Sequence, residues 1–137
     1  MEIEETIEIA RPVEEVQAYL ADPSKLPDWI GGLVDFELQP DGSFRHVMSV
    51  SGRKLPVVGR IECRVPGELV VMRVEGELGV LEAEHHLRAI EGGTRLLHRS
   101  IARIDNMLMR MVLSGMKDAA RRRLRDDLER LRGRLER

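Results

Sequence analysis

Residues 9–29 read Ile9-Ala10-Arg11-Pro12-Val13-Glu14-Glu15-Val16-Gln17-Ala18-Tyr19-Leu20-Ala21-Asp22-Pro23-Ser24-Lys25-Leu26-Pro27-Asp28-Trp29, the end of a strand followed by two short helices. Pro12 suits the first turn of a helix, and Glu14 and Glu15 lie near the positive end of its dipole. Asp22-Pro23 ends that helix, because a residue before proline disfavours helical geometry. Residues 24–30 then predict a second short helix, which Gly31-Gly32 closes.

Strands are predicted on both sides of this helical stretch. Before it, Ile3, Ile7 and Ile9 lie at odd positions with acidic residues among them, which is the period of a strand with one buried face. After it, turn signals recur every 8 to 14 residues between β-rich runs, so residues 33–104 predict an antiparallel meander. Its expected strands are 33–39, 43–51, 54–65, 68–76, 79–90 and 95–104.

The last hairpin predicts one wet and one dry face of the sheet. A four-residue loop over 91–94 would pair residue 90 with residue 95 and oppose Glu82 with Arg103 among charged neighbours. On the mostly apolar face the same register pairs Leu81 with Ile104, Ala83 with Ala102, His85 with Ser100, Leu87 with His98, and Ala89 with Leu96. A sheet with one apolar face needs a cover from the rest of the chain.

A helix of about 30 residues, beginning after Asp105 as N-cap, is predicted to supply that cover. Its first two turns, residues 107–113, are apolar on nearly every side, so we expect protein to enclose them. Ser114-Gly115 then interrupts the helix, and a bend is expected there.

This pattern of a strand, two short helices, a six-stranded meander and a long C-terminal helix resembles the helix-grip fold of the START and polyketide-cyclase (SRPBCC) superfamily. The most specific likeness lies in residues 9–16, 20–23 and 26–29, with Gly93-Thr94-Arg95 before the last strand also typical. Within the superfamily, the nearest resemblance is to the branch associated with carbon monoxide dehydrogenase and to the quinone-binding branch. The resemblance implies an α+β domain over residues 1–137, with a curved seven-stranded antiparallel sheet gripping the helix around an apolar cavity.

Composition excludes several function classes. The chain has 137 residues, one domain by the usual length prior, and its 42% hydrophobic and 34% charged residues are those of a globular protein. A net charge of -2 disfavours nucleic-acid binding, and the lone Cys63, expected to be a small buried hydrophobe, allows no internal disulfide. No apolar signal core and no run of about 18 apolar residues occur, which predicts a cytoplasmic protein.

Histidines on the expected inner face are the candidate polar groups of the site. His85 and His86 are neighbours on one strand and must point to opposite faces, so they cannot chelate one ion together. His46, His85 and His98 are expected inside, either orienting a ligand carbonyl or hydroxyl or serving as satisfied core histidines. Neither a metal site nor a cofactor is predicted, because three ligands with plausible geometry do not come together.

Trp29 and the methionines complete the candidate ligand-binding residues. Trp29, the only tryptophan, is expected at the cavity mouth in a half-apolar, half-wet position, against the alternative of a fixed core plug. Only 3% of residues are aromatic, so methionines would fill the core or line an adaptable cavity. The methionines assigned to the cavity are Met48, Met72, Met107 and Met111.

Residues 117–137 carry nine Lys and Arg against five acids. A solvated face with pairs such as Arg122 with Asp126 and Arg125 with Glu129 is favoured. Peripheral contact with anionic lipid head groups ranks second, and nucleic acid last.

The predicted function is the reversible binding or carriage of a small apolar ligand, of the lipid, quinone or isoprenoid class, without transforming it. One alternative is a cyclase or dehydratase-type enzyme using His85 or His98 as general acid or base. The other is a protein-interaction or assembly factor in which the cavity is vestigial. The sequence leaves the oligomeric state open.

Overall fold

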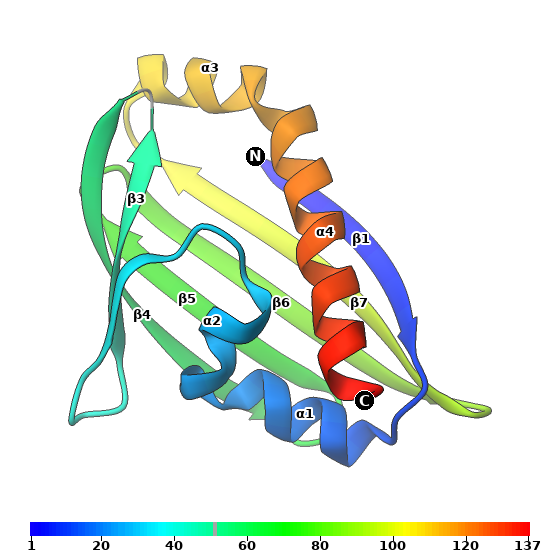
Figure 1. Ribbon diagram of the computed structural model, residues 1–137. Helices are drawn as coiled ribbons and strands as arrows, with labels where there is room; N and C mark the ends of the chain where they lie inside the picture. The colour runs from blue at the N-terminus through cyan, green and yellow to red at the C-terminus, as the bar shows by residue number, and fades with distance from the viewer. Residues whose placement is uncertain (51) are drawn as a thin grey trace.

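Seven antiparallel strands form one open sheet that curves around the C-terminal helix (Figure 1). This is a computed structural model that describes residues 1–50 and 52–137. The strands are β1 (Glu2–Ile9), β2 (Val34–Leu38), β3 (Phe44–Val50), β4 (Arg53–Val65), β5 (Leu69–Gly76), β6 (Gly79–Ile90) and β7 (Gly93–Ile104). Their order across the sheet is β1-β7-β6-β5-β4-β3-β2, so only β1 lies out of sequence order. The predicted α+β helix-grip class is confirmed.

The helical stretch between β1 and β2 folds almost as its sequence predicts. Pro12 stands just before α1 (Val13–Ala21), in extended geometry. Asp22 ends that helix and accepts a hydrogen bond from the backbone N–H of Ser24, 3.0 Å away. The predicted second helix divides into a 3₁₀ turn, η1 (Pro23–Lys25), and α2 (Leu26–Trp29).

The start of this stretch also holds the C-terminal end of the chain. The Arg11 guanidinium donates to the carbonyls of Leu135 and Arg137, at 2.7 and 3.0 Å. The backbone N–H of Ala10 donates to the Glu136 carboxylate at 2.8 Å. Because the last carbonyls of a helix lack partners within it, the arginine satisfies them and complements the helix dipole.

The β6–β7 hairpin corrects the predicted register. A two-residue loop, Glu91-Gly92, joins Ile90 to its partner Gly93, so the predicted four-residue loop is wrong. Gly92 has a φ of 83°, which glycine adopts without a steric penalty, and the tight turn can therefore close. The shift of two residues keeps each side chain on its predicted face but changes every partner.

The C-terminal segment is two helices rather than one, α3 (Met107–Gly115) and α4 (Lys117–Leu135), with the break at the expected Ser114-Gly115 interruption. The N-cap is Asn106, whose side-chain oxygen accepts from the backbone N–H of Met109 at 3.1 Å, and not the predicted Asp105. At the top of Figure 1, α3 lies across the end of the sheet, whereas α4 runs along the sheet's concave face.

Residues of α3 contradict the expectation that protein encloses them. Met107, Leu108 and Met111 are 70%, 68% and 67% exposed, and no residue of α3 is buried. The helix break turns α3 away from the sheet's concave face, so only one of its sides meets the body of the domain.

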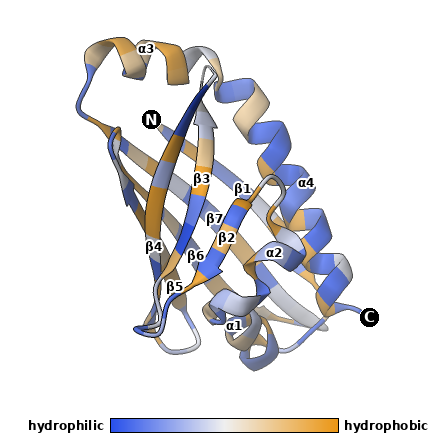
Figure 2. Cartoon of the chain, turned by 60° about the vertical axis from the view of Figure 1, so that its left-hand side comes forward, coloured by the Kyte–Doolittle hydropathy of each residue, from blue (hydrophilic) through white to orange (hydrophobic). Residues whose placement is uncertain are grey.

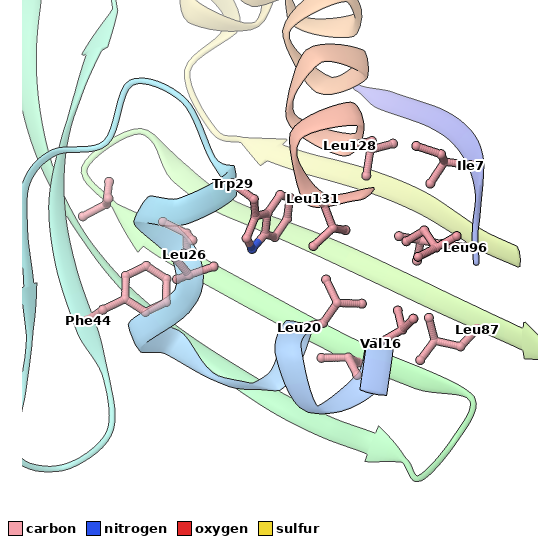
Figure 3. Close-up of a cluster of buried hydrophobic side chains, with 14 residues drawn as sticks. Ile7, Val16, Leu20, Leu26, Trp29, Phe44, Leu87, Leu96, Leu128 and Leu131 are labelled. Carbon is pink, nitrogen blue, oxygen red and sulfur yellow. The ribbon is translucent and has the colours of Figure 1, made fainter. Parts of the chain in front are cut away.

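The packed core occupies the half of the sheet that lies under α1, α2 and the C-terminal part of α4 (Figure 3). Its side chains come from both layers and include Ile7, Ile9, Val16, Leu20, Leu26, Trp29, Phe44, Leu87, Leu96, Leu128 and Leu131. Gly59 makes room for the Phe44 ring, since a Cβ at Gly59 would lie 2.2 Å from the nearest ring carbon.

Candidate functional site

The other half of the concave face is hollow. A cavity of about 260 Å³ lies between the sheet and the junction of α3 with α4, just below the range of roughly 300–1,000 Å³ typical of small-molecule sites. Its lining includes Ile3, Met48, Leu55, Val57, Val74, Leu78, Val80, Leu81, Ala102, Ile104, Leu113, Ala120 and Leu124. Among the described residues that line it, only Ser100 and Glu77 have polar side chains.

Small residues and the placement of the few aromatics leave this space open. Gly76, Gly79, Ala102 and Ala120 line the cavity and contribute little or no side-chain volume. Trp29, Phe44, Tyr19 and Phe36 all belong to or pack against the core cluster at the other end. With 3% aromatic residues, the chain has no further large ring to fill the second half of the interior.

A chain of hydrogen bonds links the cavity wall to the core. His98 shares one hydrogen bond with His85, from Nδ1 to Nε2 at 3.1 Å, and a second with Ser100, from Nε2 to Oγ at 2.6 Å. His85 and His98 are only 2% and 4% exposed, whereas Ser100 lines the cavity. Neither histidine lines the cavity, so the pair can reach a ligand there through the Ser100 hydroxyl.

Burial keeps both imidazoles neutral. Removal from water lowers the pKa of His98 to about 4. The pKa of His85 falls well below 6.5, first through burial and then through repulsion from a charged His98. A neutral imidazole has one N–H donor and one nitrogen lone pair, so the hydrogen bonds from His85 through His98 to Ser100 can all point toward Ser100 or all point away from it. The Ser100 hydroxyl can thus either donate to a ligand oxygen or accept from a ligand hydroxyl.

Trp29 is a core residue and not a rim residue. Its ring is 2% exposed and packs edge-on against His85, with ring centroids 5.9 Å apart. Figure 3 shows it between α2 and Leu131 of α4. The expectation of a half-wet position at the cavity mouth is wrong, because Gly31-Gly32 is held in place by α4 and does not leave the segment free.

Three hydrogen bonds from α4 hold Gly31 and the end of α2, and a fourth contact joins two of the α4 residues involved. Asp127, itself buried, accepts from the backbone N–H of Gly31 at 3.0 Å. Arg130 donates to the Trp29 carbonyl at 2.8 Å and to Asp127 at 3.1 Å, and Arg123 donates to the Gly31 carbonyl at 2.7 Å. Burial raises the pKa of Asp127, although the Gly31 N–H and Arg130 oppose this.

The remaining predicted site residues spread over the domain. Met48 lines the cavity, and Met72 packs against the core cluster. His46 is half-buried and stacks on Phe44, and burial lowers its pKa. Met107 and Met111 lie on the outer side of α3, away from the cavity lining.

Two expectations about the surface are also wrong. Cys63 is exposed near the end of β4 and is not the buried hydrophobe that was expected. The predicted pairs of Arg122 with Asp126 and Arg125 with Glu129 are not among the ion pairs of the described residues. Arg125 instead reaches across to Glu5 of β1, at 2.9 Å.

Ser100 is the site residue that sequence reasoning missed. The four-residue loop placed it opposite His85, whereas in the structure it lies opposite Ala83 and beside His98 on the same strand face. The alternation of His98, Ser100 and Ala102 along β7 was a usable signal, since residues two apart on a strand share a face.

Two further findings bear on the class of site. In the described part of the chain, no three His, Cys, Asp or Glu side chains gather as a metal site would require. None of the described helices is both long and apolar enough to cross a membrane.

The sequence and the fold both have counterparts among known proteins. The model of one family, described as polyketide cyclase / dehydrase and lipid transport, matches residues 1–136. The protein belongs to this family. No curated protein sequence matches this member of the polyketide cyclase / dehydrase and lipid transport family.

Solved structures share its fold at low sequence identity. A protein from Thermus thermophilus is 16% identical with a TM-score of 0.76, and the alignment covers 98% of this chain and 97% of that one. A conserved protein from Geobacillus kaustophilus is 20% identical with a TM-score of 0.73, over 98% and 95%. DynU16, from the dynemicin biosynthetic locus, is 16% identical with a TM-score of 0.66, over 98% of this chain and 47% of that one.

Proposed function

We propose that this family member reversibly binds a small apolar molecule that has one uncharged polar group. The observation that carries the proposal is the apolar cavity whose wall contains the Ser100 hydroxyl, held by a buried neutral histidine. Apolar contacts supply most of the affinity in such a site, and a single polar atom fixes the ligand's orientation.

The lining favours particular ligand chemistry. Among the described residues, no Lys, Arg or His side chain lines the cavity, and the Met1 ammonium there already donates to the Ala102 carbonyl at 3.1 Å. A ligand carboxylate would therefore lose its hydration without gaining a basic side-chain partner. An alcohol, ketone, ester or quinone oxygen avoids that cost and can pair with Ser100. Within the lipid, quinone and isoprenoid classes, the proposal therefore selects the uncharged members over fatty acids.

A matched pair of probes tests the role of Ser100. 1-Decanol and decane share a chain and differ by one hydroxyl, so the difference in their affinities isolates the polar contact. We expect both to bind in a saturable way, decanol more tightly, and Ser100→Ala to weaken decanol binding about three- to tenfold while leaving decane unchanged. If Ser100→Ala weakens both probes equally, or neither probe saturates, the proposal is wrong.

The same hydrogen-bond chain favours a second candidate, a dehydratase or cyclase-type enzyme. Ser100 is positioned by His98 and could relay a proton to or from a bound substrate. A pKa of about 4 makes His98 a weak base at neutral pH, which is why binding ranks first. The test is a ten-carbon β-hydroxy ketone, whose loss of water gives an enone that absorbs in the ultraviolet. Turnover by wild type that His98→Gln abolishes, with ketone binding retained, would favour the enzyme.

A further inference from the structure

The short helix α3 is apolar on two opposite sides, and only one of them is covered. Met109, Val112 and Leu113 are partly buried toward the body of the domain, and Leu113 lines the cavity. Met107, Leu108 and Met111 share the opposite side, because Met111 lies three residues from Leu108 and four from Met107, the spacings that are close on a helix surface. Figure 2 shows α3 mostly in the hydrophobic colour on an outer edge of the molecule.

Exposure of this apolar side of α3 to water is unfavourable. A helix that is apolar all round is normally buried, and contiguous exposed apolar patches mark interaction sites. The next turn adds Met116, also exposed, so the patch continues past the helix break. Something outside the described chain is therefore expected to cover the outer side of α3.

The size of the patch disfavours a protein partner. With nine residues, α3 is about 14 Å long and roughly 10 Å wide. That is a small part of the about 800 Å² that each partner buries in a stable protein interface. A lipid surface sets no such minimum, because binding there scales with the apolar area that enters the interface, and attraction to anionic lipids adds to it.

The charge of α3 favours an anionic surface. Arg110, which is exposed, is its only charged residue, and the helix contains no acid. Lys117 follows directly at the start of α4. Asp105 and Asp118 lie just outside these two cations in the sequence, so the attraction rests on Arg110 within the patch and is local.

We propose that α3 docks on a membrane that contains anionic lipid, with Met107, Leu108 and Met111 in the acyl region and Arg110 at the phosphates. The chain does not cross the bilayer in this arrangement; the helix lies in the interface. Docking does not depend on the proposed ligand function. It would, however, bring the cavity close to the membrane, with α3 between the two, because Leu113 on the inner side of the same helix lines that cavity.

Vesicle flotation tests the docking. On phosphatidylcholine vesicles with about 30% phosphatidylglycerol we expect wild type to bind, and Leu108→Gln/Met111→Gln to bind at least tenfold more weakly. Arg110→Gln should lose about fivefold on these vesicles and nothing on pure phosphatidylcholine. The control is Leu38→Gln, which replaces another exposed leucine, on β2 beside Phe44 at the opposite end of the sheet, and it should bind like wild type.

A fluorescent label reports which surface meets the lipid. An environment-sensitive dye on Leu108→Cys, in a Cys63→Ser background, should shift to shorter emission wavelength when vesicles are added. The same dye on the native, exposed Cys63 should not shift. Equal vesicle binding of wild type and the double variant, or a shift at Cys63 alone, would overturn the proposal. A wild-type protein that is a dimer in solution, with the double variant a monomer, would also overturn it, because a second copy of the chain would then cover α3. The double variant should still bind decanol. If it does not, the substitutions have disturbed the cavity, and that result bears on the ligand proposal and not on docking.

Discussion

Acidification should destabilise the fold through the buried histidine pair. In the native state His98 has a pKa of about 4, against about 6.5 in an unfolded chain. Between these two values the unfolded chain binds the proton and the folded chain does not, so stability falls as the pH decreases through this window. At about 1.4 kcal/mol per pH unit, the difference corresponds to a loss of about 3 kcal/mol. His85 changes stability in the same direction.

Urea denaturation followed by circular dichroism from pH 7.5 to pH 4 measures this loss. Carboxylates also titrate near the lower end, so the informative quantity is the difference between wild type and His98→Gln, which cannot titrate at that position. We expect the free energy of unfolding of wild type to fall about 2–3 kcal/mol further than that of the variant. The control is His86→Gln, which removes a histidine on the outer face beside Glu84 and leaves the buried pair in place, so the loss that depends on His98 should persist in this variant.

The reasoning fails if wild type and His98→Gln have parallel profiles. That result would mean that His98 protonates as easily in the folded protein as in the unfolded chain, and that water reaches the histidine pair. The Ser100 hydroxyl would then lose the neutral partner on which the proposed ligand contact depends.

Three further substitutions test the core, the cavity and the anchoring of α2. Ala102→Phe should fill the cavity and abolish decanol binding while the melting temperature stays the same or rises, because the new ring occupies empty space. Gly59→Ala should cost about 1–3 kcal/mol of unfolding free energy, since its methyl group would overlap the Phe44 ring, as urea denaturation can show. Arg130→Ala should cost about 1–3 kcal/mol by leaving the buried Asp127 carboxylate with fewer partners, and Arg130→Ala/Asp127→Asn should recover part of that loss.

Strand positions and faces could be predicted from the sequence because they depend on short-range patterns. Alternation along each strand fixes which side chains point inward, and an error of two residues in register leaves that alternation intact. The pairing of His85 with His98 could not be predicted in the same way. It depends on whether Gly92 closes a two-residue turn, and composition alone does not distinguish the short loop from the longer one.

The errors at Trp29 and α3 have a different physical origin. Burial of Trp29 depends on contacts from Asp127 and Arg130, about a hundred residues away in the sequence, and no local pattern carries that information. The apolar composition of residues 107–113 predicted enclosure by protein, which is wrong for Met107, Leu108 and Met111. Composition carries no information on the helix break that separates α3 from α4 and turns α3 away from the concave face.

Native mass spectrometry of the purified protein, with decanol added after organic extraction, tests the central claim most directly. The account predicts that wild type gains the mass of one decanol molecule in a saturable way, and that Ala102→Phe, which lacks the cavity, gains none. A wild-type protein that gains no decanol, or one that gains it to the same extent as Ala102→Phe, would contradict the claim that this cavity is a ligand site.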